Sequence, residues 1–325
     1  MQSFVERCWF GKNFWTYVLL PLSVLYWLIT NIRRLCYCLK IFKVYHSRVP
    51  VIVVGNIMTG GNGKTPVVIA LADFLSKRGM RVAVVSRGYR AKPPVYPYEV
   101  SVNSPIDESG DEPKLIALRA GVRVVIDPIR VRAIKYVEND VDVILTDDGL
   151  QHYAMGRDIE IVVSDGLRRQ GNGYLLPAGP LREGVSRLQQ VDFRIVNGGE
   201  SKIGEYAMQL RANKPYALDK KSQLNDGSEV CCLAGIGDPN RFYRTVESLG
   251  YKVVETIKVG DHVKVSIDEI KHAKEQWPLL MTEKDMVKYQ SYKLDNCFVV
   301  GVCAEIDSAF YEKLMLKIDK VRIKK

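Results

Sequence analysis

The sequence predicts an α/β fold of the P-loop type, with a doubly wound, mostly parallel sheet and a second, smaller α/β domain. Short apolar runs rich in β-branched residues alternate with helical patterns, and such runs are typical of strands buried on both faces of a sheet. The predicted strands cover residues 51–54, 82–85, 122–126, 143–145, 159–163 and 193–196. A glycine cluster followed by Lys64 and Thr65 comes directly after the first strand, as in many nucleotide-binding proteins.

The first segment, residues 1–47, is apolar and basic, and it predicts a helical element associated with a membrane. Residues 14–30 form an almost uninterrupted apolar run of about 17 residues, which is the lower limit for crossing a bilayer. No acidic residue occurs from Arg7 to Ala72, whereas Arg33 and Arg34 follow the run and suit an anionic cytoplasmic leaflet. A cleaved signal peptide is disfavoured because no small-x-small site follows. The alternative is a buried apolar helix that packs on the next domain.

The stretch VVGNIMTGGNGKTP, residues 53–66, predicts the phosphate-binding loop of a nucleotide-binding domain that covers residues 48–199. A P-loop is usually written G-x-x-x-x-G-K-[ST]; here the second half is intact, while Met58 occupies the place of the first glycine. The other glycines still let the backbone approach phosphates closely, before a helix predicted over 65–78. The predicted ATP contacts are Met58, Thr59, Gly60, Gly61, Asn62, Gly63, Lys64 and Thr65. The alternative is an ordinary glycine-rich turn.

Two adjacent carboxylates, Asp147 and Asp148, end the apolar run of VDVILTDDGLQHY. In P-loop enzymes the acids that bind Mg²⁺ lie at the carboxyl edge of the sheet, next to the phosphate loop. We therefore expect Asp147, Asp148 and the Thr65 hydroxyl to form a magnesium site. The alternative is a pair of acids that caps the following turn.

Asp111 and His262 are weak candidates when each is considered alone. Asp111 lies in SGDEP, just before a helical stretch, where an N-cap is the simplest expectation. His262 lies in VGDHVKVS, in a loop that follows a strand, and a single histidine of this kind is more often structural or exposed.

The C-terminal part of the chain predicts a linker and a further domain. Residues 200–228 are polar and end in DKKSQLNDGS, which indicates a linker, and a second alternation of strands and helices fills residues 229–325. In TEKD, Thr282 is expected to cap a helix, and GIGDPN is expected to be a plain strand-to-helix turn. The seven cysteines contain no C-x-x-C pair, so reduced thiols are expected and a structural zinc site is not.

Taken together, these motifs resemble the tetraacyldisaccharide 4'-kinase family of lipid A biosynthesis. The resemblance also rests on SRGYR, DDGLQH, RDIEIVVSDG and GNGYLLPAGPLRE, which occur in the order and at the spacing of the family from about residue 48 to 290. The family's loop carries GG-x-GKT without the outer glycine, so the resemblance accounts for Met58.

The resemblance implies that ATP and Mg²⁺ are used to phosphorylate the 4'-hydroxyl of a tetraacylated glucosamine disaccharide 1-phosphate, at the cytoplasmic face of the bacterial inner membrane. It implies that Lys64 stabilises the β- and γ-phosphates, and that Asp111 and His262 are a catalytic pair. That pair requires the smaller domain to close over the active site. The substrate-binding residues that the motifs imply are Arg87, Tyr89, Arg130, Gln151, His152, Asn172 and Arg182. Arg132 is an alternative to Arg130, because the family shows a single arginine where DPIRVRA stands.

Two other classes of protein remain as alternatives. A membrane-associated P-loop switch ATPase or GTPase would act on a protein partner and hydrolyse nucleotide without lipid. A membrane-binding protein with a degenerate nucleotide fold would bind no ATP, but the intact Lys64–Thr65 and Asp147–Asp148 pairs disfavour it. No nucleic-acid partner is expected.

Overall fold

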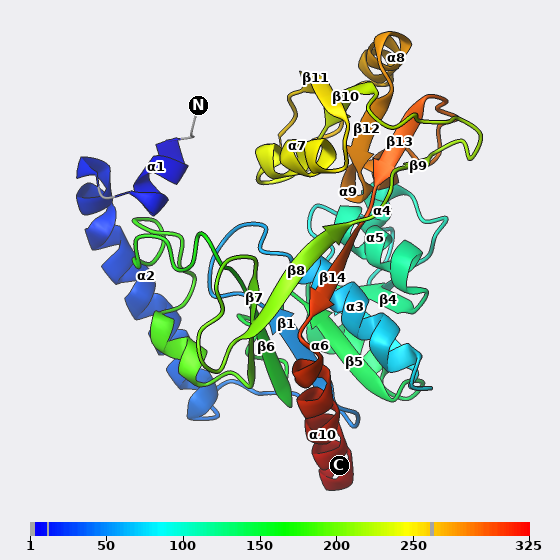
Figure 1. The fold of residues 1–325 in the computed structure, drawn as a ribbon. Coiled ribbons are helices and arrows are strands. Elements are labelled where there is room, and N and C mark those ends of the chain that lie inside the picture. Colours follow the sequence, from blue (N-terminus) through cyan, green and yellow to red (C-terminus); the bar gives the residue numbers. More distant parts are fainter. Residues whose placement is uncertain (1–3, 12, 261–262) are drawn as a thin grey trace.

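The computed structural model describes residues 4–11, 13–260 and 263–325, and it consists of two lobes, each built on one sheet (Figure 1). The larger sheet has the strand order β14-β8-β7-β6-β1-β5-β2-β4-β3, and the smaller sheet has the order β11-β10-β12-β13-β9. Both sheets are mostly parallel, which the sequence predicts for the larger one. Figure 1 shows the small lobe above the large lobe, with β8 and β14 running between the two.

The large sheet contains all six strands that the sequence predicts, together with three more at its two sides. Its parallel strands pair in register from β4 through β8, whereas β3 and β14 are antiparallel. The strands are β1 (Val51–Gly55), β2 (Val82–Ser86), β3 (Tyr98–Val100), β4 (Arg123–Ile126), β5 (Val143–Asp147), β6 (Ile159–Asp165), β7 (Phe193–Asn197), β8 (Tyr206–Ala212) and β14 (Val302–Ile306).

Helices cover both faces of this sheet. Successive side chains of a strand point to opposite faces, so Ile52 and Val54 pack with α3 (Lys64–Ser76), α5 (Asp111–Ala120) and α10 (Ser308–Lys324). Val51 and Val53 pack on the other face, with α6 (Arg130–Val137). Two short helices, α4 (Ile106–Ser109) and the 3-10 turn η1 (Val185–Gln189), lie in connections. Burial on both faces explains why these strands read as continuous apolar runs.

The small lobe has its own core on both faces of a five-stranded sheet. Its strands are β9 (Tyr216–Ala217), β10 (Glu229–Leu233), β11 (Lys252–Ile257), β12 (Leu279–Thr282) and β13 (Cys297–Val300). Its helices are α7 (Pro239–Ser248), α8 (Ile267–Gln276) and α9 (Glu283–Tyr289). As expected for TEKD, the Thr282 side chain caps α9 by accepting a hydrogen bond from the Asp285 amide.

The boundaries of the two lobes differ from the predicted linker at 200–228 and the predicted domain at 229–325. Strand β8 lies within the predicted linker yet pairs with β7 in the large sheet, and β14 and α10 return to that same lobe. The small lobe is thus an insertion, joined to the large lobe by two strands that run side by side, with the Asn213 amide donating to the Gly301 carbonyl at 2.9 Å. The sequence predicts a linker here because β8 is polar. This strand lies near the edge of the sheet, and Met208 is its one buried residue.

The N-terminal helix α2 (Phe14–Cys38) follows the short α1 (Phe4–Phe10) and is capped by the Asn13 side chain. It is the one helix of the described residues that is long and apolar enough to cross a membrane, and 11% of its most apolar window is buried. The alternative of a buried core helix is therefore wrong. Its exposed apolar side chains include Phe14, Trp15, Leu22, Leu25, Trp27, Ile29 and Leu35.

One side of α2 is nevertheless attached to the large lobe along its length (Figure 1). The Ser23 hydroxyl donates to the Leu175 carbonyl at 2.9 Å and accepts from the Ala178 amide at 3.0 Å. Further along the helix, the Tyr26 hydroxyl donates to the Arg182 carbonyl at 3.2 Å. The helix therefore lies against the segment 175–182 and presents its apolar side outward.

Replacing Phe310 with Ala tests the assignment of α10 to the large lobe. The Phe310 ring is fully buried and lies 5.3 Å from the Phe193 ring and 5.6 Å from the Tyr206 ring, centroid to centroid. We expect Phe310→Ala to lower the free energy of unfolding by about 3–5 kcal/mol, measured by urea denaturation. Leu316→Ala in the same helix is the control, because Leu316 is 63% exposed. Equal stability of the two variants would contradict this packing.

Candidate active site

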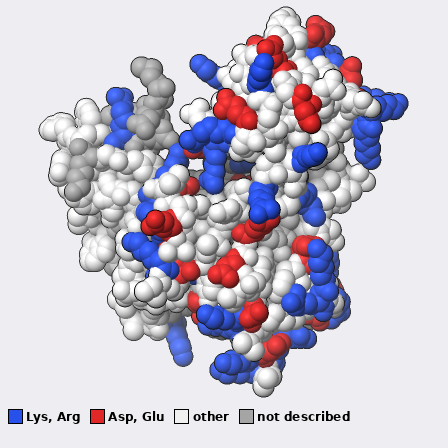
Figure 2. Space-filling model, in the orientation of Figure 1, with Lys and Arg blue, Asp and Glu red and all other residues white. Residues whose placement is uncertain are grey.

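A cavity of about 1020 Å³ lies between the lobes, at the carboxyl edge of the large sheet. It is lined by the predicted phosphate loop, by the ends of β5, β6 and β7, and by the small lobe at the turn into α7 and at the start of α9. Tyr26 and Arg33 of α2 also line it. Figure 2 shows Lys and Arg side chains gathered around the hollow beneath the small lobe. Basic groups around a large cleft suit an anionic ligand.

The predicted phosphate loop connects β1 to the N-terminus of α3. Gly63 has a φ of +88° and is the N-cap residue of α3, so Lys64 and Thr65 begin the helix. A Cβ at Gly63 would lie 2.9 Å from Asn197 Nδ2, and that nitrogen donates to the Asn62 carbonyl at 3.3 Å. Asn197, which sequence reasoning did not find, therefore supports the loop from the end of β7. Backbone N–H groups at such a helix start attract phosphate.

Met58 and Thr59 do not line the cavity, although both belong to the predicted ATP contacts. Met58 is buried and forms an antiparallel bridge with Leu181, and the Thr59 amide donates to the Pro180 carbonyl at 3.0 Å. The segment 175–183, here called the strap, thus holds the first part of the loop. At Met58 the backbone is paired with the strap and does not line the cavity. The close backbone approach to a ligand that requires a glycine therefore does not occur at this position. Gly60, Gly61, Asn62, Gly63, Lys64 and Thr65 do line the cavity.

Asp147 and Asp148 lie side by side at the end of β5 and differ in their surroundings. Burial, reinforced by Glu112 and opposed by Lys64, raises the pKa of Asp147 to about 7, and Asp147 Oδ1 makes no hydrogen bond. Burial also acts to raise the pKa of Asp148, but the positive charges of Lys64 and Arg182 outweigh it and lower that pKa. Lys64 Nζ is 3.4 Å from Asp148 Oδ1, and Arg182 Nη1 is 2.8 Å from Asp148 Oδ2.

These residues fit a magnesium ion that is shared with a nucleotide. Among the described residues no three His, Cys, Asp or Glu side chains are grouped as a complete metal site. Mg²⁺ is commonly held by one or two carboxylates, with phosphate oxygens and water as its other ligands. Asp147 has an oxygen without a hydrogen bond, and Thr65 and both acids line the same cavity. The described residues thus offer part of a coordination shell that bound ATP would complete.

Asp111 is the first residue of α5 and does not occupy the N-cap position. The N-cap residue is Gly110, without a side-chain hydrogen bond, so the N-cap interpretation of Asp111 is wrong. The Asp111 side chain lines the cavity, and its Oδ2 lies 3.8 Å from Lys288 Nζ of the small lobe. His262 lies outside the described residues, so its pairing with Asp111 stays a prediction.

Of the seven predicted substrate-binding residues, Asn172 is the one that does not line the cavity; Arg87, Tyr89, Arg130, Gln151, His152 and Arg182 do. Asn172 Nδ2 donates to the carbonyls of Cys8 and Ala178, at 2.8 Å each, and so attaches α1 to the strap.

The positions of the two arginines of DPIRVRA decide which of them belongs to the cavity. Arg132 pairs with Asp127 at 2.9 Å, away from the cavity, whereas Arg130 is buried and donates to the Asp147 carbonyl at 3.0 Å.

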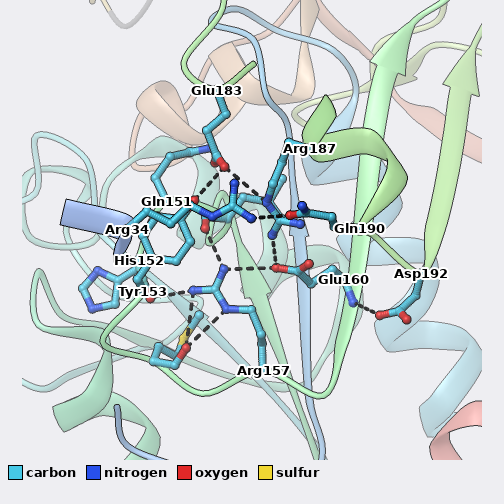
Figure 3. A network of polar contacts seen from close by, with 12 residues as sticks. Arg34, Gln151, His152, Tyr153, Arg157, Glu160, Glu183, Arg187, Gln190 and Asp192 are labelled. Atoms are coloured by element: carbon cyan, nitrogen blue, oxygen red, sulfur yellow. Dashed lines mark hydrogen bonds and ion pairs between the residues drawn. The ribbon is translucent and has the colours of Figure 1, made fainter. Parts of the chain in front are cut away.

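A network of buried polar groups supports Gln151 and His152 (Figure 3). Gln151 Nε2 and the Tyr153 hydroxyl each donate to Glu183 at 2.6 Å, and Glu183 pairs with Arg187 at 3.2 Å. Arg187 also pairs with Glu160, which in turn pairs with Arg157 at 3.1 Å.

His152 is held neutral in these surroundings. Arg157 donates to the His152 carbonyl at 2.7 Å, so the network fixes the backbone at this position. Burial, together with the positive charges of Arg130 and Arg157, lowers the pKa of His152 to about 4, and His152 Nε2 has no hydrogen-bond partner. His152 therefore lines the cavity as a neutral imidazole whose Nε2 is buried.

Comparison with known proteins gives a consistent result. A family model described as LpxK, tetraacyldisaccharide-1-P 4'-kinase, matches residues 15–319. The tetraacyldisaccharide 4'-kinase of Aeromonas salmonicida is 46% identical over 323 residues, which cover 98% of each chain. That of Aeromonas hydrophila is 48% identical over 318 residues, covering 97% of this chain and 96% of the relative. The crystal structure of LpxK from Aquifex aeolicus in complex with ATP has a TM-score of 0.77 at 30% identity, covering 93% of this chain and 99% of that one.

His152 should make the stability of the protein depend on pH. Its pKa in the folded chain is about 4, whereas an unfolded histidine titrates near 6.5. As the pH falls through this window the unfolded chain takes up a proton that the folded chain does not, so stability is lost. We expect the free energy of unfolding of His152→Gln to fall less than that of the wild type between about pH 7 and about pH 5. The same substitution at His272, which is exposed, is the control. An unchanged pH dependence in His152→Gln would contradict the neutral imidazole.

Proposed function

The chain belongs to the tetraacyldisaccharide-1-P 4'-kinase family, and from this premise we propose how the cleft between the lobes carries out the reaction. The protein is a kinase that phosphorylates the 4'-hydroxyl of the tetraacylated disaccharide 1-phosphate in lipid A biosynthesis, with ATP as the donor. The family assignment supports this activity over a switch ATPase or GTPase. The observation that carries the proposal is that Lys64 and the Asp147–Asp148 pair face one cavity, which also contains Asp111.

The phosphate loop holds the triphosphate of ATP. The N–H groups at the start of α3 bind phosphate oxygens, and the Lys64 ammonium neutralises the charge that develops between the β- and γ-phosphates. The Lys64 ammonium is held in this position by Asp148, with which it pairs at 3.4 Å. Arg182 in turn binds the other oxygen of the Asp148 carboxylate. Asp147, Asp148 and Thr65 would hold Mg²⁺, and the bound ion would shield the negative charge of the phosphates from the attacking oxygen.

Asp111 accepts the proton of the 4'-hydroxyl. The hydroxyl oxygen forms its bond to the γ-phosphorus while the bond to the β–γ bridging oxygen breaks and ADP leaves. Asp111 suits this role because it lines the cavity from the large lobe and is not the N-cap residue of α5. His262, which follows β11 in the sequence, orients or tunes this carboxylate as its partner from the small lobe.

The acceptor lies on the side of the cavity formed by Gln151, His152, Arg182 and the basic residues Arg87 and Arg130. These side chains combine positive charge with a neutral imidazole, and so provide partners for both phosphate and sugar hydroxyl groups. The acyl chains of the acceptor keep it at the membrane. We place the enzyme at the cytoplasmic face of the inner membrane, attached through the exposed apolar side of α2 and the basic residues that follow it.

Lys64→Ala should abolish most phosphoryl transfer and leave the fold intact. Loss of a charge aimed at the transferred phosphate costs on the order of 10²–10³ in kcat. The measurement is transfer of label from ATP to a disaccharide 1-phosphate lipid, with urea unfolding as the check on the fold. The control is Lys77→Ala near the end of α3, where the side chain is 72% exposed. Near-normal turnover of Lys64→Ala would remove the phosphate loop from the mechanism.

Substitutions on the exposed side of α2 should weaken membrane binding and leave the binding of ATP unchanged. Leu25 and Ile29 are 52% and 57% exposed, and burying each in lipid contributes about 1.5–3 kcal/mol. We expect the double variant Leu25→Gln, Ile29→Gln to bind phosphatidylglycerol-containing vesicles at least about tenfold more weakly in a sedimentation assay. Ile323→Gln on α10, 86% exposed, is the control. Equal sedimentation of both variants would place the membrane contact elsewhere.

A further inference from the structure

Lys288 of α9 is a buried lysine in the small lobe that the mechanism above does not use. It is 4% exposed, and its partner Asp285 is 1% exposed. Lys288 Nζ lies 2.9 Å from Asp285 Oδ1 and donates to the Val263 carbonyl at 3.1 Å. Val263 directly follows His262 in the chain. The ammonium thus ties α9 to the loop that carries the predicted histidine.

The surroundings of Asp285 keep Lys288 in one place. Asp285 Oδ2 accepts hydrogen bonds from the Gly235 amide at 2.9 Å and from the Thr282 hydroxyl at 2.7 Å. A Cβ at Gly235 would lie 2.6 Å from Asp285 Oδ1 and 3.2 Å from Lys288 Nζ, so the turn after β10 packs directly on this pair. Buried ion pairs are often no more stabilising than apolar side chains of the same size. Stability alone therefore does not account for a lysine here.

Lys288 also reaches across the gap between the lobes. Helices α5 and α9 meet through three charge pairs: Arg119 with Glu283, Glu112 with Lys284 at 3.3 Å, and Asp111 with Lys288 at 3.8 Å. The third pair joins the small lobe to the carboxylate that faces the cavity. An ammonium has three donors; Asp285 and Val263 take two of them, and Asp111 is the next nearest acceptor that the contacts show.

We propose that Lys288 is a positioning residue, which keeps Asp111 ionised and turned toward the acceptor when the small lobe lies against α5. The proposal rests on the catalytic role given to Asp111 above. A nearby positive charge favours the carboxylate form, which a proton acceptor needs, and it limits the rotation of the side chain. Because the charge comes from the small lobe, Asp111 acquires this partner only in the arrangement where the lobes meet.

A double-mutant cycle tests this role. We expect Lys288→Met to lower kcat by about 10–100-fold, the usual effect of removing a group that orients a functional side chain, while the KM for ATP changes less than about twofold. In an Asp111→Asn background, the same Lys288→Met change should alter kcat by less than about twofold, because the group on which it acts is already gone. Lys274→Met is the matched control, a lysine paired with the exposed Asp295 in the same lobe.

Each outcome decides a different point. If Lys288→Met lowers kcat equally in both backgrounds, or does not lower kcat in the wild-type background, the positioning role is overturned and Asp111 stays as the base. Full activity of Asp111→Asn would instead remove Asp111 from the mechanism. Lys288→Met leaves Asp285 buried without its counter-charge and so threatens folding. The cycle is therefore repeated with Lys288→Met combined with Asp285→Asn, since Asn keeps an acceptor for the Gly235 amide.

Discussion

The two adjacent carboxylates at the buried end of β5 are the constraint on which the cleft depends. Placing two negative charges side by side out of water costs several kcal/mol unless positive charges and hydrogen bonds offset it. Lys64 comes from the phosphate loop and Arg182 from the strap, while Arg130 from α6 binds the Asp147 backbone. Three segments that are distant in the sequence are thus held at one point. The positive charges offset the two carboxylates unequally, and Asp147 keeps an oxygen that lacks a hydrogen-bond partner, where the proposed Mg²⁺ would complete the balance.

The strap connects the apolar helix α2 to the phosphate loop. Its start binds Ser23 of α2, and near its end the Arg182 carbonyl accepts from Tyr26 while the Arg182 amide donates to the Ile57 carbonyl at 2.6 Å. A continuous set of hydrogen bonds therefore runs from the apolar helix to the phosphate loop. If α2 lies on the membrane as proposed above, this arrangement would hold the phosphate loop close to the lipid surface, where a headgroup anchored by its acyl chains could meet ATP.

Structural features that depend on residues close together in the sequence were predictable, whereas contacts between residues far apart in the sequence were not. The buried strands, the loop at Gly63 to Thr65 and the Thr282 cap each follow from a local pattern, and each is present. Asn197 under the loop and Glu183 behind Gln151 are single polar residues whose role appears only when strands and strap meet. Asp111 looked like a cap because it precedes a helix, but Gly110 takes that place. The resemblance to a family supplied the cavity-lining residues that the local patterns left ambiguous.

The insertion of the small lobe between β8 and β14 has a consequence for how the protein is made. The large sheet receives its last strand and the covering helix α10 from residues 302–324, which are synthesised after the small lobe. Until then the edge of β8 lacks its antiparallel neighbour, and the apolar surface around Phe193 and Tyr206 lacks Phe310. The phosphate-binding half therefore cannot mature during translation ahead of the small lobe. Nascent chains of this enzyme therefore expose an unpaired strand edge for as long as the small lobe is being made, which a chain of two consecutive domains would avoid.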